Sequence, residues 1–441
     1  MGHSKLGILA AGGPAPGINS VIAAATIRAR LSGIEVLGLR DGFRWIMDGN
    51  VDHTTELTID NVWPIHFRGG SFIGINRANP VRDNKLGQTV DSLRRLGIDK
   101  LICIGGDGTA YTAARLLDVA GPGLQVVHVP KTIDNDLMLP DDIPTFGFQT
   151  ARHVGVRIVQ DLHMDAVTTS RWYFIVTMGR QAGHLALGIG KAASATLTLI
   201  PEEFPERVRL KEVVDVLTGA IIKRLSQGRM DGTAVIAEGL SDRIASEDLE
   251  AETREAERDM FGKVRLAEIN LGQLLKTQVQ RRLMQLPAKL AVTIQARNVG
   301  YELRCTDPIP FDMEYTRDLG YSATKYLLEG GTGAMITIQR GQFVPITFED
   351  MLDPITHRSR VRNVDIETES YKIARRYMTR LRKDDFDYEP TIAAFAQTAG
   401  MTPEQFTQEF RYVVEGEAPP LRYAIPPSTR PPRPPVSSPR N

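Results

Sequence analysis

Short apolar runs alternate with longer helix-like stretches along most of the chain. The runs are rich in β-branched residues and end in glycine or polar residues, which favours strands. Strands are predicted at 5–11, 35–39, 100–105, 124–130, 171–178, 195–200, 233–239, 288–294 and 334–338, and helices at 19–33, 89–97, 111–121 and 210–228, among others. This alternation predicts an α/β fold built from βαβ units, with mostly parallel sheets covered by helices on both faces.

The length and composition of the chain predict a large core. With 441 residues, 42% of them hydrophobic, the chain can form two lobes rather than one. The 53 basic residues equal the 53 acidic ones, so no overall charge draws the protein to nucleic acid or to a membrane, and any anion must be bound locally.

The cysteines and the apolar runs indicate the compartment. Cys103 and Cys305 are the only cysteines, which argues against a disulfide framework and fits a reducing cytosol. There is no signal-peptide pattern and no uncharged apolar run of about 20 residues that would span a bilayer. We therefore expect a cytoplasmic protein.

Two regions differ from the rest. Residues 241–282 are highly charged, which predicts a solvated helical insertion, with an interface role as the alternative. Residues 415–441 are rich in proline and arginine, which predicts an extended or disordered tail; recognition of a partner is the alternative.

The unusual residues follow strands, where ligands bind in parallel sheets. In "GGDGT", residues 105–109, glycines permit close approach of a phosphate, the following helix offers free N–H groups, and Asp107 could hold a divalent cation. A glycine-rich turn without a ligand is the alternative. "AAGGPAPGINS", residues 10–20, is a second phosphate-cradle candidate, although it lacks the dinucleotide fingerprint and the Walker lysine.

Three further groups carry candidate chemistry. Arg77, in a glycine-rich loop, could reach a polyphosphate, or it could be an ordinary surface arginine. In "PKTIDND", residues 130–136, an extended backbone would point a hydroxyl and two carboxylates the same way, and one carboxylate could accept a proton; an Asx-rich turn is the alternative. Arg180, in "MGRQAGH", would meet a phosphate at a helix N-terminus, and we interpret His184 as a residue that packs behind the site or supports its residues, since nothing pairs it with a nucleophile.

Taken together, "GGPAPGIN", "GGDGT", "PKTIDND" and "MGR" make the chain resemble the phosphofructokinases over residues 6–323. "GGDGT" alone also occurs in NAD kinases and lipid kinases, and a non-catalytic protein of this fold is a further alternative. The resemblance implies phosphorylation of fructose 6-phosphate at its C1 hydroxyl, in glycolysis, with Mg²⁺ as the cofactor.

The resemblance also implies a role for each matching residue. Asp134 matches the catalytic base, Asp107 the residue associated with magnesium, and Arg180 and Arg77 the arginines that neutralise the phosphoryl group, with Thr132 beside the base. The implied donor site is Gly12, Gly13, Arg77, Gly106, Asp107, Gly108, Thr109 and Lys131; the implied sugar site is Thr132, Asp134, Asp136, Arg171, Met178, Gly179, Arg180, Glu238, Tyr301 and Arg304. Arg171 matches an arginine that some members lend to a neighbouring subunit.

The donor is harder to choose. Lys131 is typical of the family's pyrophosphate-dependent branch, in which its ammonium stands where the α-phosphate of a nucleotide would lie. Gly108 replaces the acidic residue typical of that branch and leaves the space for an α-phosphate open. We weight Gly108 above Lys131 and expect ATP, with pyrophosphate as the alternative.

The resemblance further implies two Rossmann-like three-layer lobes with the active site in the cleft between them. We expect residues 1–148 and about 305–375 to form the donor lobe, and residues 149–304 and about 376–414 the sugar lobe. A homodimer or homotetramer is expected.

Overall fold

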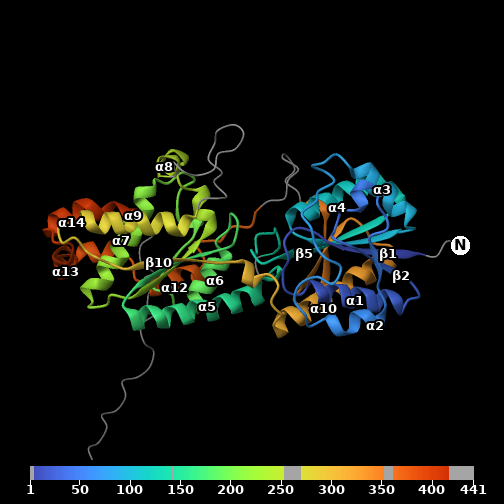
Figure 1. The fold of residues 1–441 in the computed structure, drawn as a ribbon, viewed down its shortest axis with the longest axis horizontal. Coiled ribbons are helices and arrows are strands. Elements are labelled where there is room, and N and C mark those ends of the chain that lie inside the picture. Colours follow the sequence, from blue (N-terminus) through green and yellow to red (C-terminus); the bar gives the residue numbers. More distant parts are fainter. Residues whose placement is uncertain (1–3, 141–142, 253–269, 352–360, 417–441) are drawn as a thin grey trace, which may run out of the picture.

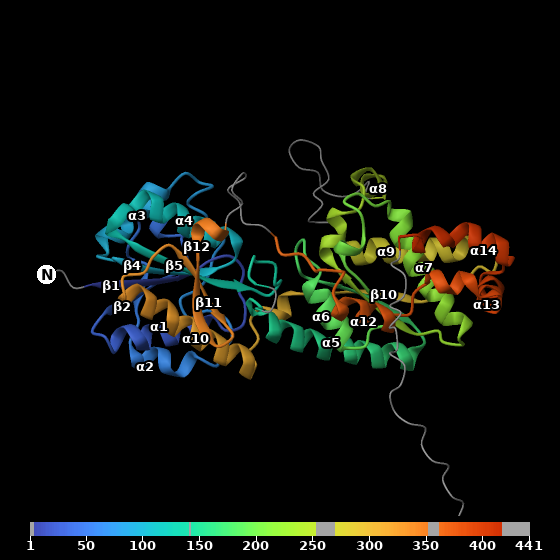
Figure 2. The ribbon, with the colours of Figure 1, turned by 180° about the vertical axis from the view of Figure 1, so that it is seen from behind.

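The computed structural model describes residues 4–140, 143–252, 270–351 and 361–416. Two lobes lie side by side, each with one sheet between layers of helices (Figures 1 and 2). Among the described residues, no helix combines the length and the hydropathy that crossing a bilayer requires.

The first lobe contains an eight-stranded sheet, with the order β12-β11-β5-β4-β1-β2-β3 and with β6 paired to β5. All its pairs are parallel except β11 with β12 and β2 with β3. The strands are β1 (Lys5–Ala10), β2 (Glu35–Leu39), β3 (Thr54–Glu56), β4 (Lys100–Gly105), β5 (Gln125–Thr132), β6 (Phe146–Gly147), β11 (Ala334–Gln339) and β12 (Gln342–Thr347).

Alternate residues of β1 divide the first lobe into two cores, because successive side chains of a strand point to opposite faces. Leu6 and Ile8 pack with α1 (Ile18–Arg30) and α10 (Pro310–Leu328), whereas Leu9 packs with α3 (Leu86–Arg95) and α4 (Asp107–Ala120). Short helices α2 (Ile59–Val62) and α11 (Phe348–Met351) complete these layers.

The second lobe contains a parallel four-stranded sheet in the order β10-β7-β9-β8. Its strands are β7 (Trp172–Thr177), β8 (Leu197–Leu199), β9 (Gly232–Ala237) and β10 (Ile294–Val299). One face packs on α7 (Leu210–Ser226), α9 (Leu271–Gln285), α13 (Glu389–Ala399) and α14 (Pro403–Phe410), and the other on α5 (Phe148–Thr169) and α6 (His184–Ala192). α12 (Glu369–Tyr377) contributes Ala374 to the core on the first of these faces and Tyr371 to the core on the second. The predicted α/β class with mostly parallel sheets is confirmed.

Three edge strands escaped prediction or were misplaced. β10 lies at Ile294–Val299 and not at 288–294, while β3 and β12 were not predicted. These strands lie at the edges of their sheets and carry polar or exposed side chains, including Pro345 in β12. Backbone pairing forms such strands without an apolar pattern, so the pattern could not reveal them.

The structure corrects two expected boundaries. α9 begins inside the predicted solvated insertion at 241–282, yet it buries Leu275 and Val279 in the second lobe's core, so this part of the segment is no solvated insertion. The chain also enters the second lobe earlier than the expected boundary near residue 376. Val364 and Tyr371 already pack beside β7 and α6 in that lobe. Residues 253–269 of the expected insertion and 417–441 of the expected tail lie outside the described residues.

Candidate active site

A cavity of about 1000 Å³ lies between the lobes. It is lined by residues at the carboxyl ends of β1, β4 and β5 in one lobe and of β7, β9 and β10 in the other. Parallel strands end at a common edge of the sheet, so residues far apart in sequence meet there.

Nearly all the predicted site residues line this cleft. They are Gly12, Gly13, Arg77, Gly106, Asp107, Gly108, Thr109, Lys131, Thr132, Asp134, Asp136, Met178, Arg180, Glu238, Tyr301 and Arg304, and Gly179 lies between two of them. Arg171 does not line the cleft, because it precedes Trp172 at the amino end of β7. His184 has its ring Nε2 3.0 Å from the carbonyl oxygen of Arg362, in keeping with a packing residue.

The glycine loop after β1 lies against two cations. Gly12 has φ of +89°, which favours glycine, and the Lys131 ammonium donates to the carbonyl oxygen of Gly13. A Cβ atom on Gly13 would collide with the Arg304 guanidinium, so any larger residue would displace that charge. The buried ammonium and the guanidinium make this end of the cleft positive.

Burial sets the titration of Lys131. Only 4% of the residue is exposed, and this burial lowers the pKa of Lys131 to about 8, against the opposing charge of Asp134. The ammonium is therefore charged at neutral pH and begins to lose its proton in mildly alkaline solution.

The loop after β4 leads directly into α4, and both line the cleft at this point. A Cβ atom on Gly105 would collide with the side chain of Thr109, whereas one on Gly108 would meet nothing within 4 Å. Below the loop, the Nε2 atom of His128 donates to the Gly105 carbonyl oxygen at 2.8 Å, and burial lowers the pKa of His128 to about 4. The histidine is therefore neutral and supports the loop.

Two carboxylates dominate the loop after β5. Asp134 and Asp136 are each 7% exposed, and the Oδ1 atom of Asp134 has no hydrogen-bond partner in the part of the chain that the structure describes. Burial and then the charge of Asp136 raise the pKa of Asp134 to about 7, while Arg180 opposes this shift. Asp134 is thus a group that can accept a proton near neutral pH.

Arg180 reaches across the cleft to the carboxylates. Its backbone has φ of +52°, and its amide donates to Glu238 Oε1 at 2.7 Å, as does that of Gly179 at 3.1 Å. The Nη1 atom of Arg180 lies 3.0 Å from Asp107 Oδ1 and 3.7 Å from Asp136 Oδ2. Glu238 therefore holds a strained turn that aims the guanidinium at the opposite lobe.

The donor set at Asp107 fits a magnesium ion that is shared with a ligand. Burial opposes ionisation, yet the pKa of Asp107 lies below its ordinary value because Arg180 is paired with it, so the carboxylate is charged. Within the described ranges, no three histidine, cysteine, aspartate or glutamate residues gather as a metal cage. Mg²⁺ commonly binds one or two carboxylates together with substrate phosphates, which suits this arrangement.

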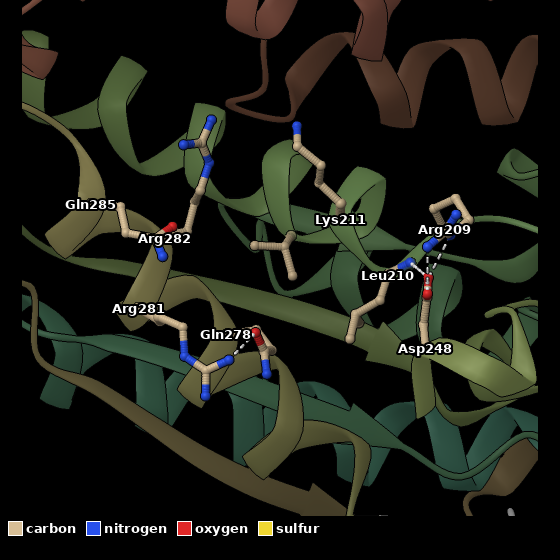
Figure 3. A pocket seen from close by; sticks show the side chains of 9 residues that line it. Arg209, Leu210, Lys211, Asp248, Gln278, Arg281, Arg282 and Gln285 are labelled. Atoms are coloured by element: carbon tan, nitrogen blue, oxygen red, sulfur yellow. Dashed lines mark hydrogen bonds and ion pairs between the residues drawn. The ribbon is translucent and has the colours of Figure 1, made fainter. Parts of the chain in front are cut away.

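A smaller cavity, of about 380 Å³, lies between α7 and α9 in the second lobe (Figure 3). Four of its nine lining residues are basic, but Arg209 pairs with Asp248, and Lys211 and Arg282 share the buried Asp215. Lys211 and Asp215 both belong to α7, whereas Arg282 ties α9 to it, so we interpret these pairs as structural, since none of them lies in the cleft.

Sequence reasoning missed two residues of the cleft's framework. His128 was a single histidine in an apolar strand, and nothing in the strand pattern marks it as the support of the next loop. Arg362 lies far along the chain in a stretch without a motif, yet its guanidinium contacts the loop that carries the carboxylates.

The chain is similar to known proteins over most of its length. The family model described as phosphofructokinase matches residues 5–327. A pyrophosphate–fructose 6-phosphate 1-phosphotransferase of Thermotoga maritima is 47% identical over 416 residues, covering 93% of this chain and 99% of that protein. Another, from Naegleria fowleri, is 45% identical, covering 93% and 96%.

A solved structure agrees in fold. The pyrophosphate-dependent phosphofructokinase of Marinobacter aquaeolei superposes with a TM-score of 0.63 at 17% identity, covering 96% of this chain and 95% of that one.

Proposed function

Because the chain belongs to the phosphofructokinase family, we propose that it transfers a phosphoryl group from pyrophosphate to the C1 hydroxyl of fructose 6-phosphate. The products are fructose 1,6-bisphosphate and orthophosphate. The observation that carries the choice of donor is the buried ammonium of Lys131 against Gly13, in a chain 47% identical to a pyrophosphate-dependent relative.

The expectation of ATP from Gly108 is wrong. The two relatives at 47% and 45% identity are both pyrophosphate-dependent by name. The space at Gly108 is open as expected, but open space supplies no contact to a nucleotide. In the structure the Lys131 ammonium is buried and bonded to Gly13, so its position favours the shorter donor.

Asp134 is the proposed base. The C1 oxygen of the sugar attacks the nearer phosphorus of pyrophosphate while its proton passes to Asp134, and the bridging P–O bond breaks to release orthophosphate. The Oδ1 atom of Asp134, which has no hydrogen-bond partner among the described residues, is available to a hydroxyl donor. Phosphoryl transfer otherwise needs position and positive charge, which Lys131, Arg180 and Arg304 supply.

Mg²⁺ is the proposed cofactor, held by Asp107 together with donor oxygens. When bound, it neutralises phosphate charge. Arg180, whose Nη1 atom lies 3.0 Å from Asp107 Oδ1, is the cation beside this site that would face the transferring group.

We propose further that the first lobe binds the donor and the second the sugar. Gly12, Gly13 and Asp107 belong to the first sheet's loops, and Glu238 and Tyr301 to the second's. Arg304 comes from the sugar side but lies against Gly13, where the two substrates would meet. A glycolytic role in the cytoplasm and a homodimeric or homotetrameric assembly complete the proposal.

The test is a direct comparison of donors. Purified protein with fructose 6-phosphate and Mg²⁺ is given pyrophosphate or ATP, and fructose 1,6-bisphosphate is measured. Turnover with pyrophosphate and at most slight turnover with ATP is expected. Equal or better use of ATP would refute the choice of donor, and no turnover with either would refute the reaction.

A further inference from the structure

The guanidinium of Arg362 is buried in the loop that follows the candidate catalytic carboxylates. The residue is 7% exposed. Its Nε atom donates to the carbonyl oxygen of Asn135 at 3.1 Å, and Nη1 donates to the carbonyl oxygens of Ile143 at 2.8 Å and Pro140 at 3.2 Å. Nη2 donates to the side-chain oxygen of Asn135. The side chain of Arg362 therefore forms hydrogen bonds with both ends of the segment 135–143.

The backbone of Arg362 strengthens this attachment. Its amide donates to the carbonyl oxygen of Asp136 at 2.9 Å, and the preceding Val361 forms an antiparallel bridge with Leu137. Asn135, between the two carboxylates, has φ of +59°, a conformation that surrounding contacts must hold. Asp134 and Asp136 thus flank a strained residue, Asn135, which the Arg362 side chain holds by hydrogen bonds, while the Arg362 amide holds Asp136.

The same short stretch also reaches the second lobe, toward which the chain crosses at this point (Figure 1). The Arg362 carbonyl oxygen accepts from His184 at the start of α6. The Val364 amide donates to Glu202 Oε1 at 2.9 Å, and that oxygen also accepts from the Gly183 amide. Since α6 follows the turn that carries Arg180, the crossing connects both sides of the cleft.

We propose that Arg362 is a positioning residue for phosphoryl transfer, which fixes Asp134 and Asp136 relative to the opposite lobe without lining the cleft itself. This inference rests on the proposed function. Its geometry requires a planar fork of donors that reaches several carbonyl oxygens at once, which a lysine ammonium at the end of a flexible stem does not reproduce.

The experiment compares Arg362→Met, Arg362→Lys and Asn135→Gly with the wild type. Asn135→Gly removes the side-chain contact yet tolerates the positive φ. Arg380→Met is the matched control, because Arg380 is 4% exposed and pairs with Glu203, outside the cleft. The measurements are kcat, the KM for each substrate, the thermal midpoint, and amide hydrogen exchange of residues 132–139.

In Arg362→Met, kcat is expected to fall by roughly 10- to 100-fold, because a small displacement of reacting groups costs this much, while each KM changes by less than about threefold. Exchange of 132–139 should speed up, Arg362→Lys should remain within a few-fold of Arg362→Met, and Asn135→Gly should lose kcat in the same way. Arg380→Met should lower the thermal midpoint but leave kcat and the exchange of 132–139 unchanged.

Wild-type kcat and wild-type exchange in Arg362→Met would overturn the proposal, as would full recovery by lysine. Should Arg362→Met fail to fold, an unchanged kcat in Asn135→Gly would overturn it equally. A wild type that does not phosphorylate fructose 6-phosphate would refute the proposed function instead, and the exchange of 132–139 would still decide whether Arg362 holds the loop.

Discussion

Replacement of Asp134 by asparagine tests the base through its pH dependence. Asparagine keeps the shape of the side chain but cannot accept the proton of the sugar hydroxyl. With a pKa of about 7, the fraction of ionised Asp134 is about 0.1 at pH 6 and about 0.9 at pH 8. A carboxyl with the ordinary aspartate pKa of 3.8 would be ionised throughout this range.

The direction in which the rate changes with pH follows from the direction of the pKa shift of Asp134. Burial and the charge of Asp136 raise the pKa, so the active carboxylate form is present above pH 7 and is lost as the pH falls through 7. The wild-type rate should therefore rise by about tenfold between pH 6 and pH 8 from this group alone. At pH 8 the variant should be slower by roughly 10²- to 10⁴-fold, the usual contribution of a general base.

The assay is kcat/KM for fructose 6-phosphate at a fixed, saturating concentration of magnesium pyrophosphate, measured from pH 6 to pH 8. The phosphates of both substrates also titrate in this range, and dividing the wild-type value by the variant value at each pH cancels their effect. A ratio that rises about tenfold supports Asp134 as the base. A flat ratio would refute the raised pKa, and a ratio near one would refute the assignment of the base.

Four further substitutions probe the rest of the cleft. Lys131→Met should raise the KM for pyrophosphate by roughly 10- to 150-fold, because a charged hydrogen bond is lost, and should abolish the rise of this KM above pH 8 that the wild type shows as Lys131 loses its proton; an unchanged KM would contradict its role. Arg304→Ala should lower kcat/KM for both substrates by at least about tenfold, since the guanidinium lies where they meet, and an effect on one substrate alone would assign it to that half of the cleft. Gly13→Ala should lower kcat by displacing that guanidinium, whereas Gly87→Ala on α3, where a Cβ meets nothing, should leave kcat unchanged; equal rates in both variants would contradict this collision. Asp107→Asn should raise the Mg²⁺ concentration needed for half-maximal rate, and an unchanged requirement would place the metal elsewhere.

The prediction of the cleft from sequence succeeded where a local pattern carried the information. Glycines and polar residues placed directly after apolar strands were expected to meet, because parallel strands share a carboxyl edge, and they do. β10 was misplaced because an edge strand needs backbone partners and no apolar run.

The donor and the framework residues depend on three-dimensional context. Gly108 and Lys131 gave opposite indications, and the sequence does not show that the ammonium is buried against Gly13. Arg362 contacts the loop at Asn135 from 227 residues away, so no spacing rule links the two. Residues that hold a site from outside it have no motif of their own.

In the ion pair between Arg180 and Asp107, each side chain serves as the counter-ion of the other. An anionic donor attracts the arginine and a divalent cation attracts the carboxylate, so each ligand takes one partner and leaves the other without compensation. If the proposed donor and metal bind here, they would be thermodynamically linked through this pair: either one would raise the affinity of the protein for the other, and by the same factor in both directions. Removal of the guanidinium would weaken this cooperativity even where each ligand still binds.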